Sequence, residues 1–444
     1  MDRREFMKTA GLGAAALGVA ACAPGAVRQQ AHERNTDFHG SMLQNYPGIG
    51  TLGYGCMRWP MIKDEAGNDI IDQEKVNEMV DFAMAHGINY FDSAPVYLQG
   101  QSEEATAKAL SRYPRDSYFI ATKLSNHRGF APTYEEGVAM YRRSLGYYNT
   151  DHIDYYLLHN IADLDAFNRR FVQNGLIDFL LGEREAGHIR HLGFSFHGYK
   201  QGFDDLMALH DKYHWDFVQI QMNYVDWEHP SGQNTRADYL YAELDKREIP
   251  IVIMEPLRGG ALADIPSQLS DQLKAREPEL SVASWAFRYV GSFPRVMVAL
   301  SGMTYMEHLQ DNLQTFLDFQ PLTEEEKQFL RSVADQMVDY PLVPCTGCQY
   351  CMPCPYGINI PGIFKFYNDN VTAGTYVVNR EQADYARARR KYLLAYDKAI
   401  PTVRQADHCI NCGTCLERCP QYIRIPTQLR RIDRYIEDLK QETL

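Results

Sequence analysis

Two runs of cysteines near the C-terminal end of the 444-residue chain have the spacing of metal-cluster ligands. The first run contains Cys345, Cys348, Cys351 and Cys354, the second contains Cys409, Cys412, Cys415 and Cys419, and a proline follows each run. Three cysteines spaced by two residues let one short loop reach three corners of a [4Fe–4S] cubane, and the fourth thiolate comes from elsewhere. The runs therefore predict two such clusters. A zinc site or a disulfide framework fits this spacing poorly.

This cysteine pattern resembles the helical dicluster ferredoxin domains that are attached to many redox enzymes. In two-cluster ferredoxins, the fourth cysteine of each run binds the cluster of the other run. The resemblance therefore implies that Cys345, Cys348, Cys351 and Cys419 hold one cluster, while Cys409, Cys412, Cys415 and Cys354 hold the other. The first run departs from the usual pattern because its last gap is two residues rather than three.

The N-terminus has the pattern of an export signal. Arg3 and Arg4 precede Phe-Met-Lys and a short apolar run, which resembles the twin-arginine signal. Cys22 ends a lipobox-like stretch, so we expect it to be lipidated, with residues 23–46 as a polar tether. The predicted location is the periplasmic face of a membrane, with the lipid as the only membrane attachment. Export of a folded protein suits clusters that are assembled in the cytoplasm.

Between these ends, apolar β-rich runs alternate with helical patterns. Predicted strands cover residues 51–57, 88–94, 118–123, 152–159, 189–196, 217–223, 249–255 and 296–301, with predicted helices at 73–86, 103–112, 134–145, 170–186, 204–214, 236–247, 282–290 and 306–319. Eight such units predict an α/β protein with a (β/α)8 TIM barrel. The alternative is a doubly wound open sheet, but no Gly-x-Gly-x-x-Gly follows the first strand.

Four polar side chains follow successive predicted strands of this barrel. They are Asp92 and Tyr97 after the second strand, Lys123 at the end of the third and His159 at the end of the fourth. Barrel enzymes place their chemistry at the carboxyl ends of the strands, so these four are expected to meet at one mouth. Each alone has a structural explanation, such as a turn cap or a buried imidazole, but their convergence favours a catalytic site.

The segments around these residues resemble the aldo-keto reductase family over nearly the whole barrel. The resemblance rests on Asn89–Tyr97, Ala121–Lys123, Leu157–His159, Gly193–Ser195, Gln219–Tyr224 and the stretch from Ser301 to Asn312. It implies that Tyr97 protonates a carbonyl oxygen as hydride arrives from a nicotinamide. The ammonium of Lys123 is expected to lower the pKa of Tyr97, Asp92 to hold Lys123, and His159 to orient the substrate.

The resemblance also implies that Ser195, Gln219, Gly302 and Asn312 contact NAD(P)(H). Several positions depart from the family pattern, because Phe196 replaces an asparagine and Met254 removes a stacking ring. Glu255 places a carboxylate near the expected phosphates, where we expect Arg258 to neutralise it. A flavin would convert two-electron into one-electron transfer, but the sequence contains no flavin motif that we recognise.

The expected domains are the signal (residues 1–22), the tether (23–46), the barrel (47–322), a connecting helix (323–340) and a mostly helical ferredoxin-like domain (341–444). The net charge of −12 disfavours nucleic acid as a partner. The prediction is an exported oxidoreductase that interconverts a small carbonyl and alcohol and exchanges electrons with a redox partner protein. The alternatives are an electron-transfer module on an inactive barrel and a zinc-stabilised surface lipoprotein.

Two helices are expected in the C-terminal domain. The stretch from Tyr385 to Tyr392 has a helical composition, and its basic part, Arg387–Lys391, is interpreted as a solvated helix face or a docking patch for an acidic redox partner rather than a nucleic-acid site. Leu429, Ile432, Ile436 and Leu439 have helical spacing. We expect this last helix to pack the ferredoxin-like domain onto the barrel.

Overall fold

The structure is a computed structural model that describes residue 38 and residues 40–127 and 133–444. The chain divides into the units Met1–Phe38 and His39–Leu444, and everything below concerns the second unit. The predicted signal and Cys22 lie outside the described residues, so export and lipid attachment stay predictions.

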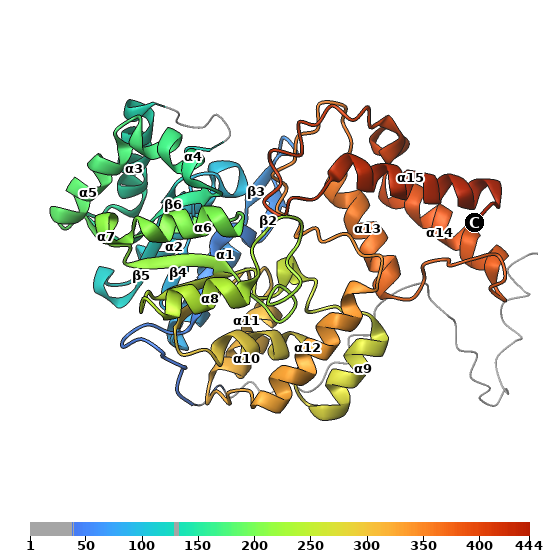
Figure 1. Cartoon of the computed structure of the whole chain (residues 1–444), viewed down its shortest axis with the longest axis horizontal. Helices are drawn as coiled ribbons and strands as arrows, with labels where there is room; N and C mark the ends of the chain where they lie inside the picture. The colour runs from blue at the N-terminus through green and yellow to red at the C-terminus, as the bar shows by residue number, and fades with distance from the viewer. Residues whose placement is uncertain (1–37, 39, 128–132) are drawn as a thin grey trace, which may run out of the picture. The chain divides into compact units, whose positions relative to one another are not determined.

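Eight parallel strands close into a barrel in the order β1-β10-β9-β8-β7-β6-β5-β4, which confirms the predicted (β/α)8 fold (Figure 1). The strands are β1 (Leu52–Gly55), β4 (Tyr90–Asp92), β5 (Phe119–Leu124), β6 (Ile153–Ile161), β7 (Ile189–Phe196), β8 (Phe217–Gln221), β9 (Ile251–Met254) and β10 (Val296–Ser301). The sequences of these strands are short apolar runs because helices cover the outer face of the barrel and side chains fill its interior. The barrel interior includes the fully buried Tyr90, Phe217 and Val252.

Helices follow the strands as expected, with local differences. They are α1 (Gln73–Ala85), α2 (Ser102–Leu110), α3 (Tyr134–Tyr148), α4 (Leu164–Phe167), α5 (Leu176–Glu185), α6 (Lys200–Ala208), α7 (His210–Tyr213), α8 (Ala237–Asp245), α9 (Ser267–Arg276), α10 (Val282–Gly291), α11 (Met306–Phe316) and α12 (Glu324–Val338). The helix expected at 170–186 is broken by the π-helix Asn168–Val172. The hairpin β2 (Met61–Lys63) with β3 (Asp69–Ile71) and helix α9 were not predicted.

The prediction of a tether is wrong at the C-terminal end of that segment, because residues 41–45 form hydrogen bonds with the barrel domain. Leu43 N donates to Phe316 O at 3.0 Å, and the Asn45 side chain donates to Val296 O at 2.8 Å. Met42 forms an isolated bridge with Leu317. Met42 and Leu43 are apolar and contact the barrel domain. The polar residues around them led to the prediction of a free tether.

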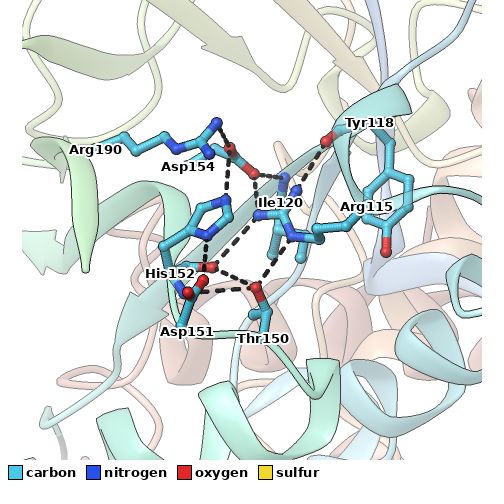
Figure 2. Close-up of polar contacts among 8 residues, drawn as sticks. All are labelled: Arg115, Tyr118, Ile120, Thr150, Asp151, His152, Asp154 and Arg190. Carbon is cyan, nitrogen blue, oxygen red and sulfur yellow. Dashed lines mark hydrogen bonds and ion pairs between the residues drawn. The ribbon is translucent and has the colours of Figure 1, made fainter. Parts of the chain in front are cut away.

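A buried carboxylate joins the N-terminal ends of three neighbouring strands (Figure 2). Asp154, at the start of β6, pairs with Arg115 at 2.5 Å and Arg190 at 3.1 Å and accepts the Ile120 N–H at 2.9 Å. Charged hydrogen bonds on both oxygens compensate for burying this group. Because it lies at the end of the barrel opposite the strand carboxyl ends, we interpret it as structural.

The C-terminal region is helical and has a core of its own. Its helices α13 (Ile360–Thr372), α14 (Tyr385–Ala399) and α15 (Ile425–Gln441) pack together (Figure 1). The apolar face of α15, which includes Leu429, Ile432 and Leu439, is buried in this core with Phe364 and Tyr396. The expectation that α15 packs onto the barrel is therefore wrong, because its apolar stripe is used within the C-terminal domain. In the part of the chain that the structure describes, no helix is both long and apolar enough to span a membrane.

Candidate active site and cysteine clusters

The structure brings the four predicted catalytic residues together at the mouth of the barrel. Lys123 Nζ lies 2.5 Å from Asp92 Oδ1 and 4.8 Å from the ring centroid of Tyr97. The rings of Tyr97 and His159 meet edge to face with centroids 5.9 Å apart. Lys123, Asp92 and His159 are at most 6% exposed. Adjacent parallel strands create this arrangement, since β4, β5 and β6 are hydrogen-bonded neighbours.

Local backbone strain also gathers at this mouth. Leu98 and Gln99, which follow Tyr97, have φ values of 49° and 57°, and Asn160, which follows His159, has 55°. Non-glycine residues adopt this left-handed region at a cost of about 1–3 kcal/mol each, and such residues cluster at functional sites. These residues directly follow Tyr97 and His159, whose rings are in edge-to-face contact.

The electrostatics of Tyr97 differ from the sequence-based expectation. Burial raises the pKa of the Tyr97 hydroxyl well above its ordinary value, and the charge of Asp92 raises it further. The expected lowering by Lys123 is wrong because the ammonium lies over the ring and is paired with Asp92. Tyr97 therefore keeps its proton at neutral pH, which suits a proton donor better than a base.

His159 is held as a neutral ring. Burial lowers its pKa well below the ordinary value, and the positive charges of neighbours such as His127 and Lys123 lower it further. Its Nδ1 lies 2.6 Å from Ser125 Oγ. In the tautomer in which Ser125 donates to Nδ1, the remaining proton is on Nε2, where it can be donated to a substrate oxygen.

The predicted nucleotide contacts form two separate groups. Ser195 and Gln219 are register partners on β7 and β8, and Gln219 Nε2 donates to Asp92 Oδ2 at 3.3 Å. Asn312 donates to Ser301 Oγ at 2.9 Å, beside Gly302. A Cβ at Gly302 would lie 2.8 Å from Arg58 Cδ, so this glycine allows Arg58 to approach closely.

Two guanidinium groups line a cavity of about 1110 Å³ next to this second group. Arg58 and Arg258 contribute to its wall with Gly259 and Gly260, and the Arg258 Nε is buried without a hydrogen-bond partner among the described residues. Cations and an unsatisfied donor in a cavity of this size fit the diphosphate of a dinucleotide. The two arginines therefore fit the diphosphate of the cofactor that the resemblance implies, whereas Ser195, Gln219, Gly302 and Asn312 do not line this cavity.

The expected partner of Glu255 needs correction. Arg258 pairs with Asp226 at 3.1 Å, and Arg58 is the cation that acts on Glu255. Burial raises the pKa of Glu255, while Arg58 opposes that shift. Glu255 is therefore buried beside Arg58 and is not among the residues that line the cavity.

The first group of thiols forms around the first cysteine run. Burial raises the pKa of Cys345, Cys348 and Cys351, and Cys419 is close enough for its charge to raise all three further. Cys419 therefore lies with the first run, as the ferredoxin resemblance implied. These four thiols supply the donor set of one [4Fe–4S] cluster.

The second group forms around the second run. Burial raises the pKa of Cys415 to about 11, with further contributions from Cys409, Cys412 and Cys354. These four also line one cavity, so Cys354 lies with the second run. No three His, Cys, Asp or Glu side chains among the described residues are grouped to hold a single ion. A cubane is a different case, because each thiolate binds a different iron.

Loops from both cysteine runs contact the barrel mouth. Arg58, after β1, donates to Thr346 O at 2.5 Å, and a Cβ at Gly259, after β9, would lie 2.4 Å from Thr346 O. After the second run, Gln421 exchanges hydrogen bonds with Gln221 at 2.8 and 3.2 Å. The first thiol group is thereby held next to the mouth.

Sequence reasoning missed two aromatic residues that connect the thiols to the catalytic residues. The ring of Tyr350, between Cys348 and Cys351, lies 6.4 Å from that of His127, and His127 lies 4.8 Å from His159. His127 could have been found from its position just after the third predicted strand. Tyr350 could not, since its place depends on how the two domains pack.

A polar pocket of about 370 Å³ opens beside His127 and has walls from both domains. Asn126, His127, Asn160, Ala162, Ala166, Arg169 and Arg170 form the barrel side, and Glu417, Cys419, Pro420 and Tyr422 form the other side. A small polar molecule in this pocket would lie beside His127 and against Cys419 of the first thiol group.

The fold and the site define a redox barrel with an appended cysteine-rich domain, and comparisons with known proteins agree. Residues 51–335 match the aldo/keto reductase family, and residues 344–424 match the 4Fe-4S dicluster domain. The chain belongs to the aldo/keto reductase family and carries a 4Fe-4S dicluster domain, which together make it an oxidoreductase.

Individual relatives match the barrel. An uncharacterized oxidoreductase, YqkF of Bacillus subtilis, is 25% identical over 316 residues, which are 65% of this chain and 94% of that protein. The holo form of an aldo-keto reductase from Bacillus halodurans has a TM-score of 0.52 at 22% identity and covers 66% of this chain and 96% of its own. An aldo-keto reductase from Klebsiella pneumoniae in complex with NADPH has a TM-score of 0.52 at 20% identity, covering 67% and 95%. At these identities, the solved structures support the fold.

The grouping of thiols generates a test with paired substitutions. Cys345→Ser with Cys419→Ser should remove the ligands of one cluster and leave about half of the iron and acid-labile sulfide, because the other four thiols remain. Cys409→Ser with Cys419→Ser, a matched pair of the same size, should damage both clusters. Iron and sulfide analysis of anaerobically purified protein measures this. The reverse ranking would contradict the grouping.

Proposed function

We propose that the protein interconverts a small carbonyl compound and its alcohol at the Tyr97 site and exchanges the electrons through two [4Fe–4S] clusters. The observation that carries the proposal is the row of aromatic rings from Tyr350, in the first cysteine loop, through His127 and His159 to Tyr97. It supports a direct connection between the cysteine-rich domain and the catalytic residues.

The roles of the catalytic residues follow from their positions. Tyr97, which is protonated at neutral pH, donates its hydroxyl proton to the carbonyl oxygen, although burial raises its pKa and makes it a weaker acid. Neutral His159 orients the same oxygen through Nε2–H. Lys123 and Asp92 form a buried ion pair, and the ammonium of Lys123 lies against the ring of Tyr97 and holds it in place.

Cofactors complete the electron count. Reducing a carbonyl to an alcohol takes one hydride, which NAD(P)H would supply, and one proton, which Tyr97 would supply; two clusters that each exchange one electron match the two electrons that, with one proton, restore the hydride donor. The eight cysteines would hold the clusters. Arg58 and Arg258 would hold the diphosphate of NAD(P)(H), which supplies hydride when bound. The NADPH-bound relative supports this assignment by analogy.

The polar pocket between the domains supports a polar substrate. Asn160 and Arg169 present an amide and a guanidinium that can hydrogen-bond hydroxyl or carboxylate oxygens, while the polar groups of Asn126 and Arg170 are largely bonded to each other. The substrate class proposed is therefore a small, oxygen-rich carbonyl or alcohol.

Replacing the proposed proton donor tests the function. Tyr97→Phe should lower turnover of active aldehydes and ketones by about 10²–10⁴-fold, because it removes the proton and keeps the ring. Turnover is measured on a panel of carbonyl compounds with NADPH. Tyr156→Phe, which alters another fully buried tyrosine in β6, is the matched control and should keep activity.

Equal activity of the Tyr97→Phe variant and the wild-type protein would contradict the mechanism. Clusters reducible by dithionite in a protein that turns over no carbonyl compound would favour the alternative, an electron-transfer module on an inactive barrel.

We further propose that the protein is exported by the twin-arginine route and anchored at the periplasmic face through Cys22. Arg3→Lys with Arg4→Lys should leave the protein in the cytoplasm, whereas Cys22→Ser should release it from the membrane fraction into the periplasm. Cell fractionation measures both outcomes. Unchanged location of either variant would contradict the corresponding half of this proposal.

A further inference from the structure

We propose that the surface around Cys412, together with the outward face of α14, docks an acidic one-electron carrier protein. The inference rests on the proposed function, because it requires a cluster in the second thiol group. It adds the place where electrons enter or leave the protein and the kind of partner that brings them.

The second thiol group lies open to solvent, unlike the first. Cys412 is exposed, whereas the loops of the first group press against the barrel through Thr346 and Tyr350. A carrier protein could therefore approach the second group directly. This ordering makes the first group the inner electron site and the second group the outer one.

Apolar side chains surround Cys412. Ile410 is 63% exposed, and it lines the cavity of the second thiol group together with the 46% exposed Tyr356. Leu416, 41% exposed, lies beside Gly413, and Val403, 74% exposed, lies beside Gly357. These four residues form an apolar rim. Exposed apolar residues grouped around one functional centre are typical of an interaction site.

The outward face of α14 is cationic. Arg387, Arg390, Lys391, Leu394 and Lys398 share this face at helical spacing. The opposite face is fixed inward, because Tyr392 and Tyr396 are 2% exposed and Arg389 donates to Lys440 O at 2.8 Å. The orientation of the cations follows from this packing.

These cations stand out in a chain whose net charge is −12. Arg387 pairs with Asp384 at 3.1 Å. Within the described residues, Arg390, Lys391 and Lys398 make no ion pair with an acidic side chain. Their charge is therefore available to a partner, and complementary charge speeds association and orients it.

The cationic face and the apolar rim are continuous. The chain leaves α14 at Ala399 and reaches Val403 and Arg404 within a few residues. Arg404 Nε donates to Gly357 O at 3.3 Å, and Asn359 N donates to Arg404 O at 3.0 Å. A partner seated on α14 would thus also cover the rim.

Acidic residues also lie near α14 and the second cysteine run, and one of them is held by a hydrogen bond within the domain. Asp397 accepts a hydrogen bond from Gln405 Nε2 at 3.1 Å, while Asp407 and Glu417 are exposed near the second run. The balance of charge along α14 remains positive. The matching partner carries an acidic patch around an exposed redox centre, and its apolar centre meets the rim.

The electron transfer itself involves no bond or proton. In each encounter the reduced carrier loses one electron and the outer cluster gains it. Two encounters carry the two electrons that, with one proton, restore the hydride donor used in one carbonyl reduction, and the reverse sequence removes them.

The test compares binding of an acidic plant-type ferredoxin with that of a basic cytochrome c to the full-length protein with its clusters. A gallium-substituted ferredoxin, which cannot exchange electrons, gives the dissociation constant by titration. Arg390→Glu with Lys391→Glu should raise it about tenfold or more at low ionic strength, and the difference should shrink in high salt. Val403→Asp should weaken binding as well.

Lys75→Glu with Lys108→Glu, on helices α1 and α2 of the barrel, reverses the same number of charges and should change nothing. Dithionite should reduce the clusters equally in all variants. Equal binding of ferredoxin and cytochrome c, or unchanged binding by the α14 variant, would overturn the docking site alone. Absence of clusters from the wild-type protein would overturn the proposed function as well.

Discussion

The contact between the cysteine loops and the barrel mouth is the constraint on which the rest of this structure depends. Arg58 reaches Thr346, Gln221 exchanges hydrogen bonds with Gln421, and Gly259 leaves room for Thr346. Without these contacts the chain would be a barrel and a cysteine-rich domain joined by a linker. With them, the first thiol group is held next to the barrel mouth.

That placement explains features that are otherwise puzzling. The cations at the predicted nucleotide site divide their roles, since Arg58 binds Thr346 O and acts on Glu255 while Arg258 pairs with Asp226. Tyr350, in the first cysteine loop, lies against His127 at this mouth. Burial in turn raises the pKa of Tyr97 and lowers that of His159, which sets both groups in the protonation states that carbonyl reduction needs.

The sequence was sufficient to predict which strands carry the four candidate catalytic residues. Asp92, Tyr97, Lys123 and His159 could be predicted to meet because parallel strands end at one face of a barrel, and the periodicity located all eight strands. The assignment of Cys419 and Cys354 to opposite groups came from the ferredoxin resemblance, and the structure places both accordingly.

What failed depended on tertiary packing. The helix containing Leu429 and Ile432 showed an apolar stripe, but the stripe could not say which surface it would meet, and it meets the core of its own domain. The effect of Lys123 on Tyr97 depended on whether the ammonium lies at the hydroxyl or over the ring. Tyr350 lacked any signal, because its role arises only when two domains far apart in sequence are packed together.

The central claim is that the barrel site and the clusters exchange electrons. It is tested most directly by electron paramagnetic resonance of the anaerobic, oxidised protein after NADPH is added. The account predicts the signal of reduced [4Fe–4S] clusters, at up to two electrons for each NADPH consumed. Clusters that dithionite reduces and NADPH leaves oxidised would contradict it.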